Sequence, residues 1–132
     1  MENLNKIEYL SGKADVKREA TIPYNEKVCD FIGELSKELI LAPESKKYPD
    51  IKAFAFWCRK KNILNLKKKF LSDETRLGLG LIFHITPSNI PTNFAYSLIF
   101  GLLTGNSNIV KVPSQKFEQV LIICKSINKI LK

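Results

Sequence analysis

The sequence predicts an α/β protein in which helices come first and a strand–helix–strand–helix (βαβα) unit follows. Apolar residues recur at helical spacing from Tyr24 to about Leu71. Two short apolar runs, GLGLIFHIT (78–86) and NIVKVP (108–113), then flank one helix-length segment, as in a parallel strand–helix–strand unit. The chain therefore divides into an arm, a helical segment and a βαβα unit, at residues 1–23, 24–77 and 78–132.

The arm and the first helix differ in periodicity. Residues 1–22 have mixed charge and little periodicity, which predicts a loosely held arm. A helix is predicted over residues 24–41, and APESKKYP (42–49) is interpreted as a loop. The expected apolar face of this helix comprises Val28, Phe31, Ile32, Leu35 and Leu39.

A second helix is predicted to begin near Pro49, a residue that suits the first turn. We expect Asn62 to end it and a short helix to follow at about 64–71. The expected apolar face of the second helix comprises Ile51, Phe54, Ala55 and Cys58, widened by Trp57.

In the βαβα unit, the first strand (78–86) is predicted to be buried on both faces, because its apolar run is continuous. A helix is predicted over 92–106, with Gly105 as its stop signal, and a second helix follows the second strand. The inward residues are expected to be Phe94, Ser97, Leu98, Gly101 and Leu102 in the first helix and Phe117, Val120, Leu121, Cys124, Ile127 and Leu131 in the second.

Gly78 and Gly80 lie before the first strand. A dinucleotide fingerprint follows a strand, so these glycines predict a tight turn and close packing instead. GNSNIVK (105–111) lacks the spacing of a phosphate-binding P-loop.

Composition restricts the class of protein. The chain has 132 residues, of which 45% are hydrophobic, enough for one modest domain. No apolar stretch reaches the length of a membrane span, and the charged start lacks the apolar centre of a signal peptide. Three cysteines show neither disulfide nor metal-site spacing. We therefore expect a cytoplasmic protein with no membrane partner.

The net charge of +8 raises the question of nucleic acid, most sharply at KKNILNLKKK (60–69). Nearly all the basic residues are lysines, whereas base readout favours arginine. The lysines are also scattered along the chain. We therefore interpret this stretch as a solvated helix face and expect no nucleic-acid partner.

The two most polar connections of the βαβα unit, HITPSNIP (84–91) and KVPS (111–114), follow its two strands. Parallel strands end at one edge of a sheet, and ligands bind beyond that edge. The sequence therefore predicts that these connections lie side by side at a ligand site.

Several residues of this edge have two interpretations. Asn89, or Ser88, could cap the helix that is reached through Pro91, or the amide of Asn89 could donate to a developing oxyanion. Lys111 could be exposed without a role, or it could reach a ribose or phosphate. His84 is expected to be a hydrogen-bonded core residue. The cysteines lie on helices without an activating loop, so none is expected to be a nucleophile.

The block GLIFHITPSNIPTNFAYSLIFGLLTGNSNIVKVPS (80–114) resembles the start of the cofactor domain of LuxC-type acyl-CoA reductases, relatives of the aldehyde dehydrogenases. FAFWCRKKNILNLKK (54–68) resembles the helices that precede that domain, so the resemblance covers about residues 24–132. It implies that the βαβα unit is part of a Rossmann-like, aldehyde-dehydrogenase-type cofactor domain.

The resemblance also implies roles for single residues. Thr86, Pro87, Asn89 and Pro91 match the superfamily segment Thr-Pro-Trp-Asn-Phe-Pro, with Ser88 in place of Trp. It thus favours Asn89 as the oxyanion donor and puts Thr86 and Pro87 at the cofactor.

Two further residues match the ribose-binding part of the superfamily pattern. Lys111 matches the lysine that binds the adenosine ribose. Ser114 stands where many NAD-preferring relatives carry an acid. A hydroxyl does not repel a 2′-phosphate, which implies NADPH as cofactor.

The family's nucleophilic cysteine lies well over a hundred residues downstream of this block, and Cys29, Cys58 and Cys124 do not match it. The resemblance therefore implies an N-terminal fragment of a fatty acyl-CoA reductase, which makes long-chain aldehyde and feeds luciferase in bioluminescence operons. We expect either a complementing C-terminal fragment as partner, or an inert product that serves at most as a nucleotide- or partner-binding module.

Overall fold

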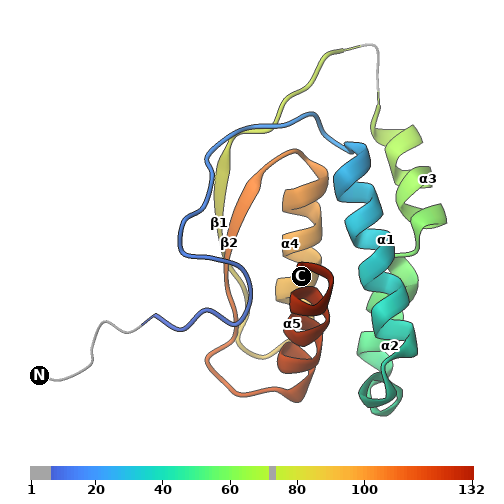
Figure 1. Cartoon of the computed structure of the whole chain (residues 1–132), viewed down its shortest axis with the longest axis vertical. Helices are drawn as coiled ribbons and strands as arrows, with labels where there is room; N and C mark the ends of the chain where they lie inside the picture. Colours follow the sequence, from blue (N-terminus) through green and yellow to red (C-terminus); the bar gives the residue numbers. More distant parts are fainter. Residues whose placement is uncertain (1–6, 72–73) are drawn as a thin grey trace, which may run out of the picture.

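The computed structural model describes residues 7–71 and 74–132 and has a mixed α/β architecture (Figure 1). A two-stranded parallel sheet forms one layer, α4 and α5 lie beside it, and α1, α2 and α3 pack beyond these two helices, with Phe54 and Trp57 of α2 against Tyr96 of α4. The elements are α1 (Glu26–Leu41), the 3-10 helix η1 (Pro43–Lys47), α2 (Pro49–Trp57), α3 (Lys60–Phe70), β1 (Leu81–Ile85), α4 (Asn93–Leu103), β2 (Ser107–Lys111) and α5 (Glu118–Ile130).

The first helix confirms the sequence prediction. Asn25 caps α1, because its side-chain oxygen accepts a hydrogen bond from the Val28 N–H at 3.0 Å. Ile32, Leu35 and Leu39 are fully buried in the core that α1 shares with α2, α3 and α4. The predicted face is therefore the packed one.

The boundary between α2 and α3 differs from the prediction. The expected loop before α2 contains η1, and the helical run breaks at Cys58–Arg59, where the backbone of Arg59 leaves the helical region (ψ 137°). Asn62 does not end a helix, so that prediction is wrong. It lies inside α3, and its amide donates to the Phe56 carbonyl at the end of α2 (2.8 Å).

The parallel pairing of β1 with β2 is confirmed, with Leu81 opposite Ser107 and Ile85 opposite Lys111. The prediction that β1 is buried on both faces is wrong. Phe83 and Ile85 are 59% and 76% exposed, because the described helices all lie on the other side of the sheet (Figure 1). We call Phe83, Ile85 and Ile109, which alternate with the helix-facing residues, the outer apolar face.

The helices of the βαβα unit are present, and Gly105 ends α4 with a φ of 86°, as its position predicts. The inward face of α5 is only partly the expected one. Leu121 and Leu131 are more than half exposed, whereas Ile123 and Ser126 are buried. In α4, which contacts both the sheet and α1, Ala95, Ile99 and Leu103 are also buried, while Ser97, Leu98 and Leu102 are half-buried.

The arm is attached at the amino ends of the strands, which differs from the loose arm expected. The Thr21 N–H donates to the Gly105 carbonyl (2.9 Å), and the Gly78 N–H donates to the Thr21 carbonyl (3.1 Å). A Cβ on Gly78 would collide with the Gly105 carbonyl. Close packing at Gly78 is thus confirmed, and it secures the arm against the sheet.

Candidate functional site

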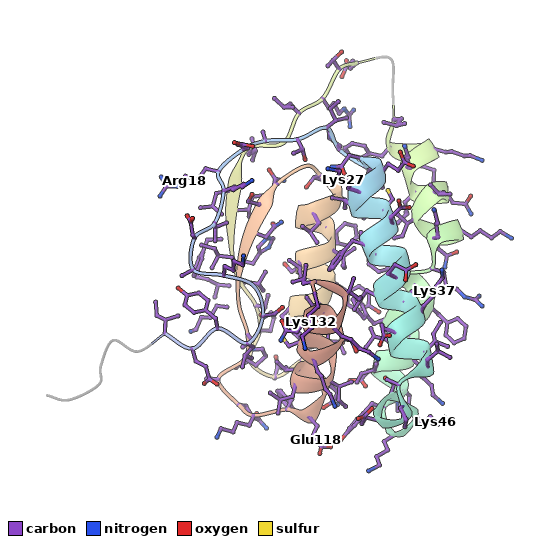
Figure 2. The ribbon with its side chains drawn as sticks, viewed as in Figure 1. Arg18, Lys27, Lys37, Lys46, Glu118 and Lys132 are labelled. Atoms are coloured by element: carbon purple, nitrogen blue, oxygen red, sulfur yellow. The ribbon has the colours of Figure 1, made fainter. Side chains whose placement is uncertain are left out.

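The carboxyl ends of β1 and β2 lie side by side, because Ile85 is paired with Lys111. The connections that follow them, residues 86–92 and 112–117, therefore leave the sheet at the same edge. In Figure 2 this is the end at which Glu118 begins α5, and Arg18 and Lys27 are at the opposite end. The predicted juxtaposition of the two polar connections is present.

Thr86 joins the two connections directly. Its Oγ1 donates a hydrogen bond to the Lys111 carbonyl at 2.9 Å. Pro87, the next residue, is exposed, whereas Pro113 on the other connection is buried. Thr86 and Pro87 thus lie at the sheet edge where the sequence predicts them. The Thr86 hydroxyl proton is used in a hydrogen bond within the protein.

Asn89 is exposed in a turn, and its side chain makes no hydrogen bond to another described residue. The N-cap of α4 is Thr92, and α4 has no side-chain cap. The interpretation of Ser88 or Asn89 as the cap is therefore wrong. The turn at Ser88–Asn89 keeps these side chains outside the helix, so the Asn89 amide is available to donate.

Lys111 and Ser114 are both exposed on the β2 side of the edge. Lys111 forms no ion pair with any residue in the described ranges. The sequence contains no Asp or Glu between Glu74 and Glu118, a stretch that includes both strands and both connections. The candidate site thus has an unpaired cation and no carboxylate among its own residues.

A polar cluster underlies the sheet next to this edge. His84 lies 3.0 Å from Ser97 Oγ through Nδ1 and 2.8 Å from Asn108 Oδ1 through Nε2. The Asn108 amide nitrogen donates to the Asn106 carbonyl, so Oδ1 faces the ring and His84 donates through Nε2–H. His84 is a hydrogen-bonded structural residue, as predicted.

The three cysteines are buried and free. Burial raises the pKa of Cys58 to about 12 and that of Cys124 to about 11. Burial is also the main cause of the raised pKa of Cys29. These thiols stay protonated near neutral pH and lie on helical elements away from the edge, so none is suited to attack a carbonyl.

The described residues contain neither a metal-site cluster nor a membrane-spanning helix. Over residues 7–71 and 74–132, no group of three His, Cys, Asp or Glu side chains could hold a metal ion. Within the same ranges, none of the helices combines the length and apolar character that a membrane crossing requires.

These features define an α/β protein with a polar, acid-free candidate ligand site at the carboxyl ends of parallel strands. The family model for acyl-CoA reductase (LuxC) matches residues 17–130, and the chain belongs to this family. Membership implies an acyl substrate and a nicotinamide cofactor. No curated protein and no solved structure matches the sequence.

Two features of the edge were not anticipated from the sequence. The Thr86 hydroxyl bonds a backbone carbonyl of the other strand, and Thr92 takes the N-cap position. The signal for the first was present, since Thr-Pro and Val-Pro each directly follow a strand. Only the register of the strands shows that Thr86 meets Lys111.

Proposed function

We propose that residues 78–132 form the oxyanion and cofactor half of a fatty acyl-CoA reductase that makes long-chain aldehyde with NADPH. The observation that carries the proposal is the exposed Asn89 amide, which has no hydrogen-bond partner among the described residues, beside the unpaired Lys111 at one sheet edge. The unit would be part of a Rossmann-like domain of the aldehyde dehydrogenase type, in keeping with its parallel strands and intervening helix.

Asn89 would bind the oxygen of the acyl group. Attack of an enzyme thiolate on the acyl-CoA carbonyl gives a tetrahedral intermediate with negative charge on that oxygen. When the C=O bond re-forms, the bond to the CoA sulfur breaks, CoA leaves as a thiolate, and the acyl group stays on the enzyme as a thioester. The Asn89 amide, held between Pro87 and Pro91, would donate to the oxygen while it is negative. The start of α4 has no side-chain cap, and its backbone N–H groups would also favour a negatively charged oxygen nearby.

The residues on the β2 side suit NADPH. Lys111 and Ser114 would contact the adenosine ribose, and no carboxylate of the two connections would repel a 2′-phosphate. NADPH, when bound, supplies the hydride that reduces the acyl carbon. Lys111 would position its ribose, and Thr86 and Pro87 would line the other side of the site.

The nucleophile would be a cysteine that these 132 residues do not contain. Cys29, Cys58 and Cys124 are buried and hold their protons, so the reaction requires a second segment that carries a reactive thiol. We propose that this segment docks as a complementing C-terminal part. The same buried thiols favour a second candidate function for the 132 residues alone, an inert nucleotide- or partner-binding module.

Co-expression with a Cys-bearing C-terminal part of this family separates the two functions. We expect NADPH oxidation that depends on acyl-CoA and releases aldehyde, and that is lost when the added cysteine is replaced by alanine. The matched control keeps that cysteine and carries Asn89→Ala. Binding of the added part without any turnover would instead support the inert module.

A further inference from the structure

The pairing of β1 with β2 ends at the candidate site for a reason that the register shows. The Ser107 N–H donates to the Gly80 carbonyl at 2.7 Å, so odd-numbered residues of β2 donate to even-numbered residues of β1. If this alternation continued, the next backbone N–H donor after Lys111 would be that of residue 113, and it would donate to the Thr86 carbonyl. Residue 113 is proline, which has no N–H, so the backbone ladder cannot continue.

A side-chain hydrogen bond joins the two chain segments at the point where the backbone pairing of β1 with β2 stops. Thr86 Oγ1 donates to the Lys111 carbonyl at 2.9 Å. This bond links the segment that carries Asn89 to the segment that carries Lys111 and Ser114. Beyond it, no hydrogen bond within the described part of the chain joins residues 87–92 to residues 112–117.

We propose that Thr86 is a positioning residue, whose hydroxyl fixes the Asn89 segment relative to the Lys111–Ser114 segment instead of contacting the cofactor. The proposal rests on the proposed function, in which these segments hold the acyl oxygen and the ribose. A hydroxyl has one proton to donate, and the Lys111 carbonyl takes it. The two segments must stay in register, because a displacement of about 1 Å can lower a reaction rate by about 10²-fold.

Two substitutions in the 132-residue chain test the role of the hydroxyl. Thr86→Val keeps the shape of the side chain and removes the donor, whereas Thr86→Ser keeps the donor. Calorimetry measures affinity for adenosine 2′,5′-bisphosphate, which stands for the adenosine half of NADPH. Hydrogen exchange measures the backbone amides of residues 86–92 and 111–117. Thr86→Ala replaces Thr86→Val if circular dichroism shows that valine disturbs the fold.

Thr86→Val is expected to weaken nucleotide binding about 3- to 10-fold, the effect of one hydrogen bond, and to speed exchange in both segments. Thr86→Ser should stay within about 2-fold of the wild type in both measurements. Unchanged exchange in Thr86→Val overturns the proposal. If affinity falls while exchange is unchanged, Thr86 contacts the nucleotide itself, which also overturns it.

Lys111→Ala distinguishes this inference from the proposed function. If the wild type fails to bind the nucleotide, or if Lys111→Ala binds as well as the wild type, the proposed cofactor site is wrong, and exchange alone decides the role of Thr86. If Lys111→Ala weakens binding and Thr86→Val changes neither measurement, the cofactor site stands and the positioning role is wrong.

Discussion

Two asparagines near the starts of helices have different surroundings. Asn25 caps α1 through a 3.0 Å hydrogen bond to the Val28 N–H. Asn89 precedes α4 by a few residues, is exposed and bonds no other described residue. Substitution of Asn25 therefore removes a stabilising contact, whereas substitution of Asn89 removes none.

Asn89→Ala, in an enzyme completed by a Cys-bearing part, should lower the acylation rate by about 10²–10³, the effect of one oxyanion donor. The melting temperature and cofactor affinity should stay nearly unchanged. Asn25→Ala is the matched control, with a loss of about 1 kcal/mol in unfolding free energy and little effect on acylation. Rapid mixing gives the rate, and thermal unfolding gives the stability. A less stable Asn89→Ala variant with normal acylation would make Asn89 a structural residue.

Ser114→Glu should weaken NADPH binding more than NADH binding, because the new carboxylate would repel the 2′-phosphate. Gln115→Glu adds the same charge one residue away, at another exposed position, and should discriminate less. Fluorescence titration of the completed enzyme with both cofactors measures the difference. Equal weakening of the two cofactors by Ser114→Glu would place Ser114 away from the ribose.

Cys58 is fully buried, and burial raises its pKa from 9.0 to about 12. The folded state therefore favours the protonated thiol. Its contribution to stability is complete below pH 9 and is lost as the pH rises through about 12. At pH 9, maleimide should label Cys58 at least ~100-fold more slowly in the folded chain than in denaturant, as followed by mass spectrometry. Equal rates would mean that the thiol is accessible and ionised.

The sequence predicts which residues lie at the candidate site better than it predicts the hydrogen bonds that they make. Residue types and strand order bring Thr86, Asn89, Lys111 and Ser114 to one edge. The contacts depend on the register between two strands 26 residues apart, which periodicity does not specify. For this reason the Thr86 bond and the uncapped Asn89 appear only in the structure.

At the level of elements, long amphipathic patterns predict well and boundaries do not. The α1 face is correct because three of its five predicted apolar positions are fully buried and the other two are partly buried against the core. Asn62 is not the α2–α3 break that the sequence predicts, because the break lies at Cys58–Arg59 and the Asn62 amide donates to the Phe56 carbonyl across it. The predicted α5 face is only partly correct because the helix is apolar on more than one side, and packing against α1 selects among these sides.

Two helix-interior glycines should respond in opposite directions to the same substitution. In α4, a Cβ on Gly101 would collide with Asn108 Oδ1 and lie 3.0 Å from His84 Nε2. In α1, a Cβ on Gly33 would make ordinary contact with Lys60 Cβ at 3.4 Å. Gly101→Ala should cost about 1–3 kcal/mol, and Gly33→Ala should gain about 0.5–1 kcal/mol. Denaturant unfolding measures both, and a stable Gly101→Ala variant would refute the close packing of α4 on the sheet.

At the scale of the whole molecule, the outer apolar face is an exposed apolar surface on the side of the sheet away from the described helices. A parallel sheet is ordinarily covered on both faces. Here Phe83 and Ile85 are more than half exposed, and Ile109 is 37% exposed. The helices alone therefore leave the sheet half-covered.

The 132-residue chain by itself should be prone to aggregate through this face as its concentration rises, and it should reduce no acyl-CoA. Phe83→Thr with Ile85→Thr should raise solubility, whereas Leu121→Thr with Leu131→Thr, on the exposed side of α5, should change it less. Light scattering at increasing concentration compares the two variants. Acyl-CoA reduction by the chain alone, abolished by alanine at one of its own cysteines, would contradict the expected inactivity.

The attachment of the arm at Gly105 has a consequence for how the protein forms during synthesis. Thr21 leaves the ribosome long before its partner, since 84 residues separate it from Gly105. At about 5–20 residues per second, this gap corresponds to roughly 4–17 s. Closing so long a loop costs entropy before any contact repays it. Neither Thr21 nor β1 can make these pairings until β2 has been synthesised, so we expect the sheet, the α4 crossover and the attachment at Thr21 to assemble together in one late step.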